Sequence, residues 1–341
     1  MTAAANDTMD TGLAREERPM QLDDQTIELL VRCAWLYYEE GLTQQEIADR
    51  LGISRLRVNR LLKQARDTGI VQISIQHPSV RLIELEERLI DHFRLMRAVV
   101  IPTPLDRTQL KRVLGKAAAT YLERALRPGD CLGVTWGTTL LEVAQQLVPR
   151  SVSNLRVVQI TGGLTPDVGE INPFDIARRV AEAFDARCYY LYAPMFVSRP
   201  EVCEALMNEP FIAHVLEQAR SATHVLTSVG EMEPTATFRQ VGYLDEATFR
   251  SLIGMGAVGS MFARFYDALG QPVPSDLDRR TVAIRLEDLN AIEDVIVVAG
   301  GPAKVRALLG ALRGGYVKTL ITDAGTARAL LTADGAVGTP P

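Results

Sequence analysis

Basic side chains that could hold nucleic acid gather in one short stretch of the sequence. From Ser54 to Arg66 the chain carries five basic residues and no acidic one. The 341-residue chain as a whole has a net charge of −5, so the positive field that phosphate binding needs is confined to this stretch. Arginine pairs with the O6 and N7 atoms of guanine, asparagine with the N6 and N7 atoms of adenine, and lysine with phosphate. The chemistry expected of this stretch is therefore DNA binding.

The residues around the basic stretch predict the elements that position it. Apolar residues at helical spacing predict a first helix over residues 24–40. Thr43 and Glu46 have the spacing of a capping box that opens a second, short helix, and Ser54 caps a third. A short helix, a turn and a basic helix are typical of the helix-turn-helix motif, whose second helix lies in the major groove. The alternation in residues 70–76 predicts a small strand after the motif.

Helical rotation separates two faces of the third predicted helix. At about 100° per residue, Val58, Leu61 and Leu62 share an apolar face, and the opposite face is polar and basic. Taken alone, a basic helix is more often a solvated surface. The order of capping box, turn glycine Gly52, second cap and acid-free helix favours DNA binding. We expect the DNA-binding residues to be Thr43, Gln44, Ser54, Arg55, Arg57, Asn59, Arg60 and Lys63.

Glycine and hydroxyl residues recur where predicted strands end. In an open parallel sheet, ligands collect beyond the carboxyl ends of the strands, next to helix N-termini that attract anions. Such residues follow several predicted strands, and Lys304 lies in the first turn of a later helix. Ordinary turns use the same residue types, but the repetition together with a lysine favours a phosphate site. The expected effector-binding residues are Gly137, Thr138, Thr139, Gly162, Gly163, Gly301 and Lys304.

The remaining pattern predicts how the chain is organised. A helix over residues 80–93 has a leucine stripe that either pairs subunits or packs on its own effector domain. Beyond it, short β-branched runs alternate with helical segments, which favours a mainly parallel sheet of the α/β class. The predicted strands cover residues 98–101, 131–135, 156–161, 187–191, 224–229, 281–286, 294–299 and 318–322. The predicted domains are a mobile tail (1–22), a helix-turn-helix domain (23–78), a connector helix (79–95) and an effector-binding domain (96–341).

Other reactive residues form no catalytic or metal-binding set. The four histidines stand apart from any obvious nucleophile or paired carboxylate, and the four cysteines form no CxxC pair. We therefore expect no catalytic residue, metal or cofactor, and cysteines that are reduced and mostly buried. Asp267 and Asp323 lie near predicted turns, where each serves either a polyol site or an ordinary turn. No apolar run approaches the ~20 residues of a membrane helix and no signal peptide is evident, so we expect a cytoplasmic protein without membrane contacts.

Six motifs follow one another in a fixed order along the chain. They are Gly41-Leu-Thr-Gln-Gln-Glu-Ile-Ala48, Val134-Thr-Trp-Gly-Thr-Thr-Leu140, Gly256-Ala-Val-Gly259, Phe265-Tyr-Asp-Ala-Leu-Gly270, Ala299-Gly-Gly-Pro-Ala-Lys304 and Leu320-Ile-Thr-Asp-Ala-Gly-Thr-Ala327. With them, residues 27–333 resemble the SorC family of sugar-sensing bacterial transcription regulators. Two positions depart from the family pattern: Ser260 replaces a frequent acidic residue, and Ser228-Val-Gly230 replaces a common Gly-Ile-Gly.

The resemblance implies a DNA-binding domain followed by a sugar-binding domain whose fold is related to sugar-phosphate isomerases and deaminases. It implies a phosphorylated sugar or polyol effector whose phosphate lies at Gly137, Thr138, Thr139 and Lys304, and a homo-oligomer, commonly a tetramer. The expected function is regulation of a carbohydrate catabolic operon through double-stranded operator DNA. The alternative is a sugar-phosphate isomerase or deaminase that carries a DNA-binding module, which the missing acid–base set disfavours.

Overall fold

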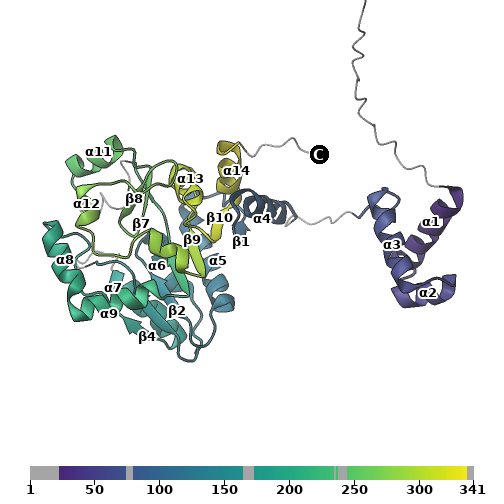
Figure 1. The fold of residues 1–341 in the computed structure, drawn as a ribbon, viewed down its shortest axis with the longest axis horizontal. Coiled ribbons are helices and arrows are strands. Elements are labelled where there is room, and N and C mark those ends of the chain that lie inside the picture. Colours follow the sequence, from purple (N-terminus) through teal and green to yellow (C-terminus); the bar gives the residue numbers. More distant parts are fainter. Residues whose placement is uncertain (1–22, 74–79, 164–172, 234–235, 237–243, 336–341) are drawn as a thin grey trace, which may run out of the picture. The chain divides into compact units, whose positions relative to one another are not determined.

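The computed structural model describes residues 23–73, 80–163, 173–233, 236 and 244–335. The chain divides into two compact units, residues 1–76 and residues 77–341 (Figure 1). The tail expected over residues 1–22 lies outside the described residues. None of the helices in the described ranges is both long enough and apolar enough to cross a bilayer.

Three helices form the first unit, and local capping sets their bounds. They are α1 (Asp24–Tyr38), α2 (Gln44–Leu51) and α3 (Arg55–Asp67). Thr43 and Glu46 make the predicted capping box, and Gly52 ends α2 in the left-handed conformation with φ of 66°. The Ser54 hydroxyl then accepts a hydrogen bond from the Arg57 amide at 3.2 Å, which starts α3. The core between the helices consists of Leu30, Cys33, Ala34, Leu36, Ile47, Ala48, Val58, Leu61, Leu62 and Ala65.

The strand predicted after the motif is wrong for residues 70–73, which form a bend and irregular structure. Gly69 has a φ of 75°, so the chain reverses at the end of α3. The Val71 amide then donates a hydrogen bond to the Ala65 carbonyl at 2.9 Å, so it bonds to the end of α3 and not to a neighbouring strand. Residues 74–76 of the prediction lie outside the described residues.

A seven-stranded parallel sheet is the centre of the second unit, which confirms the predicted fold class. Its strand order is β1-β10-β9-β5-β2-β3-β4. The strands are β1 (Arg97–Ile101), β2 (Cys131–Val134), β3 (Arg156–Gln159), β4 (Arg187–Tyr189), β5 (His224–Thr227), β9 (Asp294–Val298) and β10 (Thr319–Asp323).

Helices cover both faces of this sheet (Figure 1). Alternate residues of β9 enter two separate apolar clusters: Val295 joins one and Ile296 the other. Helices α4 (Val80–Phe93), α8 (Pro200–Asn208), α9 (Pro210–Arg220), α13 (Val305–Arg313) and α14 (Ala324–Ala333) supply the first cluster. Helices α5 (Leu110–Ala125), α6 (Thr138–Gln146), α7 (Pro173–Phe184) and α11 (Glu246–Gly254) supply the second.

Helix α4, expected as a connector, belongs to the second unit and packs against β1 and α14. Leu85 and Leu89 are buried in the apolar cluster that they share with β1 and α14. The Glu86 carboxylate accepts a hydrogen bond from the Val100 amide at 2.8 Å. His92 Nε2 lies 2.9 Å from a carboxylate oxygen of Asp334, just after α14. Of the two alternatives for the leucine stripe, the structure therefore shows packing against the chain's own effector domain.

A small antiparallel sheet that the sequence did not predict lies beside the main one. It consists of β6 (Gly230–Glu231), β7 (Gly259–Met261) and β8 (Arg264–Tyr266).

The strand predicted over residues 281–286 is wrong, because Thr281 and Ala283 form only isolated bridges. The buried Arg264 guanidinium donates to the carbonyls of Thr281, Ala283 and Ile284 at 3.0 to 3.2 Å. These carbonyls therefore bond to a side chain and not to a neighbouring strand. The segment is followed by a 3₁₀ helix, Glu287–Ala291.

Candidate DNA-binding surface and effector pocket

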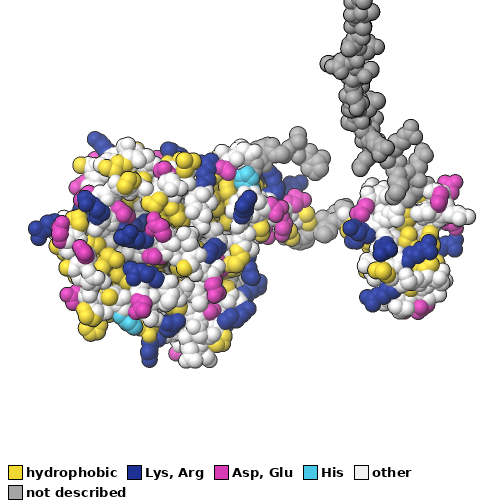
Figure 2. All heavy atoms as spheres, viewed as in Figure 1, with side chains coloured by type: hydrophobic (Ala, Val, Ile, Leu, Met, Phe, Trp, Pro, Cys, Tyr) yellow, Lys and Arg dark blue, Asp and Glu magenta, His cyan; other side chains and the backbone are white. Residues whose placement is uncertain are grey.

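Helix α3 presents the predicted DNA-binding residues on its exposed face. Arg55, Arg57, Asn59, Arg60 and Lys63 are all exposed, and the apolar residues of α3 face the core. Among residues 23–73, the four basic side chains of this set have no ion-pair partner, so their charges are available to phosphate and base edges. Figure 2 shows basic side chains of this unit spread over one face of it.

The other predicted contacts lie where α2 and α3 begin. Thr43, Gln44 and Arg55 line one surface hollow, so the structure brings these three residues together. The Thr43 hydroxyl is engaged in the capping box with Glu46, and the Ser54 hydroxyl caps α3. These two hydroxyls therefore hold helix ends in the structure. Each cap occupies the amide of one first-turn residue, Glu46 in α2 and Arg57 in α3.

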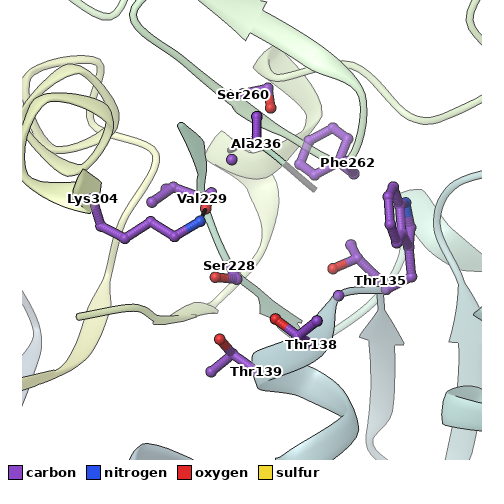
Figure 3. Close-up of a pocket in the computed structure, with 12 residues that line it drawn as sticks. Thr135, Thr138, Thr139, Ser228, Val229, Ala236, Ser260, Phe262 and Lys304 are labelled. Atoms are coloured by element: carbon purple, nitrogen blue, oxygen red, sulfur yellow. Dashed lines mark hydrogen bonds between the residues drawn. The ribbon is translucent and has the colours of Figure 1, made fainter. Parts of the chain in front are cut away.

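The second unit has a pocket at the carboxyl ends of β2 and β5, where parallel sheets of this class bind ligands. Four predicted effector residues, Gly137, Thr138, Thr139 and Lys304, line it together. Figure 3 shows the side chains of Thr138, Thr139 and Lys304 around it. Gly137 has a φ of 143° and no side chain caps α6. The first amides of α6 therefore face the pocket without an intrahelical acceptor, and the positive end of the helix dipole adds to them.

Lys304 enters the pocket opposite α6, from the short helix η3 (Pro302–Lys304) (Figure 3). Its ammonium group donates to the Val229 carbonyl oxygen at 2.7 Å and forms an ion pair with Glu231. Lys304 is the one charged residue among the described residues that line the pocket. Lys304 and the N-terminus of α6, which no side chain caps, therefore border the same pocket.

The remaining predicted effector residues lie elsewhere in the second unit. A side chain on Gly162 would come within 2.5 Å of the Pro194 carbonyl oxygen, and one on Gly163 within 2.5 Å of the Pro173 ring. These two glycines therefore permit close packing and do not line the pocket. Gly301 lines a separate cavity near the ends of β1 and β10.

Asp323 and Asp267 serve the fold. The buried Asp323 carboxylate accepts hydrogen bonds from the Thr103 hydroxyl at 2.5 Å, from the Gly301 amide at 3.3 Å and from the start of α14. Burial alone raises the pKa of Asp323, but the hydrogen bonds from Thr103, Thr326 and Gly301 outweigh it and lower the pKa. Asp267 accepts the amides of Leu269 and Gln271 in a turn. The sequence left open a polyol site or an ordinary turn for each carboxylate, and the structure shows a helix cap for Asp323 and a turn for Asp267.

Several pocket residues were not predicted from the sequence. Thr135 and Trp136 precede Gly137 in the same turn, so the motif itself contained a signal for them. Phe262 and Ala236 reach the pocket from the region of the small antiparallel sheet, for which the sequence gave no periodic signal. Ser228, Val229 and Gly230, one of the glycine and hydroxyl strand ends that the sequence indicated, also line the pocket, as does Ser260, so both departures from the family pattern lie in its wall.

Comparison with known proteins covers both units. The family described as "Putative sugar-binding domain" matches residues 77–332, and "Sigma-70, region 4" matches residues 30–68. The deoxyribonucleoside regulator of Bacillus subtilis is 35% identical over 312 residues, which cover 91% of this chain and 99% of that protein. The erythritol catabolism regulatory protein EryD of Brucella abortus is 31% identical over 306 residues, which cover 89% of this chain and 96% of that protein.

A solved structure matches over both units as well. The full-length sorbitol operon regulator SorC from Klebsiella pneumoniae has a TM-score of 0.71 and 28% sequence identity, and the match covers 90% of this chain and all of that one. These relatives are transcription regulators, and they confirm the predicted family and the predicted function class. The chain therefore belongs to the SorC family of sugar-sensing, DNA-binding transcription regulators.

Proposed function

We propose that this regulator controls a carbohydrate catabolic operon in response to a phosphorylated sugar or polyol. The observation that carries the proposal is the meeting of Gly137, Thr138, Thr139 and Lys304 at one pocket. The α6 N-terminus and the lysine suit a phosphate, and the hydroxyls of Thr135 and Ser228 lie where they can bond to a polyol. The relatives named as a deoxyribonucleoside regulator and as a regulatory protein of erythritol catabolism support an effector of this class.

A phosphorylated effector is expected to stabilise the second unit by about 2.7 kcal/mol at a hundredfold excess over its dissociation constant. A thermal-shift screen of the full chain with pairs of phosphorylated and unphosphorylated sugars and polyols measures this. Lys304→Met should remove most of the preference for the phosphorylated member of each pair, because the lysine is the cation in the pocket. Lys111→Met, on the exposed side of α5, is the matched control and should leave the preference unchanged. Equal affinity for both members of every pair would contradict the phosphate role.

We propose that the pocket binds its effector without turnover. The described residues that line it include no carboxylate and no histidine that could act as general acid or base. Turnover of a bound sugar phosphate by the pure protein, at a rate that Lys304→Met abolishes, would favour the isomerase or deaminase alternative.

We propose that the regulator acts as a homo-oligomer, with the tetramer that the family resemblance implies. One helix-turn-helix contacts a short half-site, so specific control uses two-fold pairing of units at half-sites separated by whole helical turns. For the effector to change operator affinity it must bind two arrangements of the oligomer unequally.

Reciprocal titrations should show the same coupling from both sides. A tenfold change of operator affinity on effector binding corresponds to about 1.4 kcal/mol, and saturating operator must change effector affinity by the same factor. Light scattering gives the mass of the species that binds. A monomer at operator-binding concentrations, or an effector affinity that operator leaves unchanged while the effector alters DNA binding, would refute this mechanism.

A further inference from the structure

The ion pair between Lys304 and Glu231 places a second charge beside the effector pocket. Lys304 comes from η3, and Glu231 comes from β6 of the small antiparallel sheet. Their side chains are only 20% and 12% exposed, so water screens the pair weakly. The backbone of β6 holds the carboxylate in place, because Gly230 and Glu231 pair with Ser260 and Gly259 of β7.

The two partners of Lys304 restrict what the lysine can offer to a ligand. An ammonium group has three hydrogens, and the Val229 carbonyl and the Glu231 carboxylate take two of them. The cation in the pocket is therefore already neutralised by a carboxylate that lies next to it. A phosphate that approaches Lys304 must either draw the ammonium group away from Glu231 or lie close to its negative charge. Both outcomes weaken the binding of an anion.

The uncharged parts of a ligand are not repelled by the Glu231 carboxylate. Thr135, Ser228 and Ser260 line the pocket and carry no charge, so they do not repel the hydroxyl groups of a sugar or polyol. These hydroxyl contacts supply binding free energy that offsets the repulsion between the phosphate and the Glu231 carboxylate. A bare anion lacks them.

We propose that Glu231 is a specificity residue, which competes with the ligand's phosphate for Lys304 and so keeps simple anions out of the pocket. The proposal rests on the proposed function, because it takes the pocket to be a phosphate site. Glutamine at position 231 retains an oxygen that accepts a hydrogen bond from Lys304 but carries no charge. The lysine would keep its position and gain a free charge for an incoming anion.

Titration of the full chain with inorganic phosphate tests the proposal. Glu231→Gln should bind inorganic phosphate about tenfold more tightly than the natural protein, which is ~1.4 kcal/mol. Glu231→Asp has a shorter side chain that withdraws the carboxylate from the lysine. Its affinity for inorganic phosphate should lie between those of the natural protein and of Glu231→Gln. Glu201→Gln removes an exposed carboxylate from α8, outside the pocket lining, and should leave the affinity unchanged.

The other outcomes separate this proposal from the proposed function. If Lys304→Met loses phosphate binding while Glu231→Gln binds as the natural protein does, the pocket holds phosphate and the role of Glu231 is wrong. Weaker binding by Glu231→Gln would likewise overturn it, since the carboxylate would then only position the lysine. If no variant responds to phosphate and Lys304→Met keeps the natural response to phosphorylated sugars, the phosphate site itself is refuted, and this proposal with it.

Discussion

Replacing Arg60 with alanine is expected to weaken binding to the specific operator by about 1–3 kcal/mol, roughly 5- to 150-fold. Arg60 is exposed in the middle of α3 and has no ion-pair partner among the described residues. A bidentate contact with guanine explains the size of the effect, because its loss leaves the base edge unpaired. Fluorescence anisotropy with operator duplexes and with scrambled duplexes measures it, and the ratio of the two affinities should fall.

Two further variants show whether base reading is the cause. Lys63→Ala should weaken binding to both duplexes alike and reduce the slope of affinity against salt, as expected for a phosphate contact. Arg50→Ala removes an arginine from α2 that already pairs with Glu40 at 3.0 Å, and should change the affinity little. An unchanged operator affinity in a folded protein that lacks both Arg60 and Lys63 would rule out α3 as the recognition helix.

Replacing Arg264 with methionine is expected to destabilise the second unit by about 3–5 kcal/mol. The arginine is 5% exposed, and its guanidinium donates to the carbonyls of Asp278, Thr281, Ala283 and Ile284 and to the Asp278 carboxylate. Methionine fills much of the volume but donates to none of these oxygens, so most of the loss comes from buried carbonyls that lose their guanidinium donor.

Urea unfolding followed by the emission of Trp136 measures this loss. Trp35 is the other tryptophan of the chain, so a Trp35→Phe background limits the signal to the second unit. Arg250→Met is the matched control: its pair with Glu246 is exposed, and the expected change is within about 0.5 kcal/mol. Equal stabilities of the two arginine variants would show that the guanidinium network contributes little.

Local signals explain which parts of the fold could be predicted from the sequence. The capping box at Thr43, the cap at Ser54 and the turn at Gly52 act within a few residues, so their pattern is readable in one window. The central strands are buried on both faces, as in Asp294–Val298, and read as continuous apolar runs.

The rest depends on contacts between distant residues. Residues 281–286 have the apolar alternation of a strand, but the Arg264 guanidinium donates hydrogen bonds to the carbonyls of Thr281 and Ala283, which a strand would use for a neighbouring strand. The strands of the small sheet are only two or three residues long, too short for a period to be seen. For the same reason the Gly137–Thr139 wall of the pocket was predictable from one motif, whereas Phe262 and the pairing of Glu231 with Lys304 were not.

Three of the four cysteines, Cys33, Cys131 and Cys203, are buried and can serve as chemical probes of local opening in this regulator, whereas Cys188 is half-buried. Burial raises the pKa of Cys33, Cys131 and Cys203, and that of Cys188 to about 11, so little reactive thiolate forms while the fold is closed. Alkylation of the three buried thiols then proceeds only as fast as the structure around them opens. Cys33 is the one cysteine of the first unit, and the other three belong to the second. The modification rate of Cys33, resolved by mass spectrometry, therefore reports the opening of the DNA-reading unit, and the rates of Cys131 and Cys203 report the opening of the effector-binding unit.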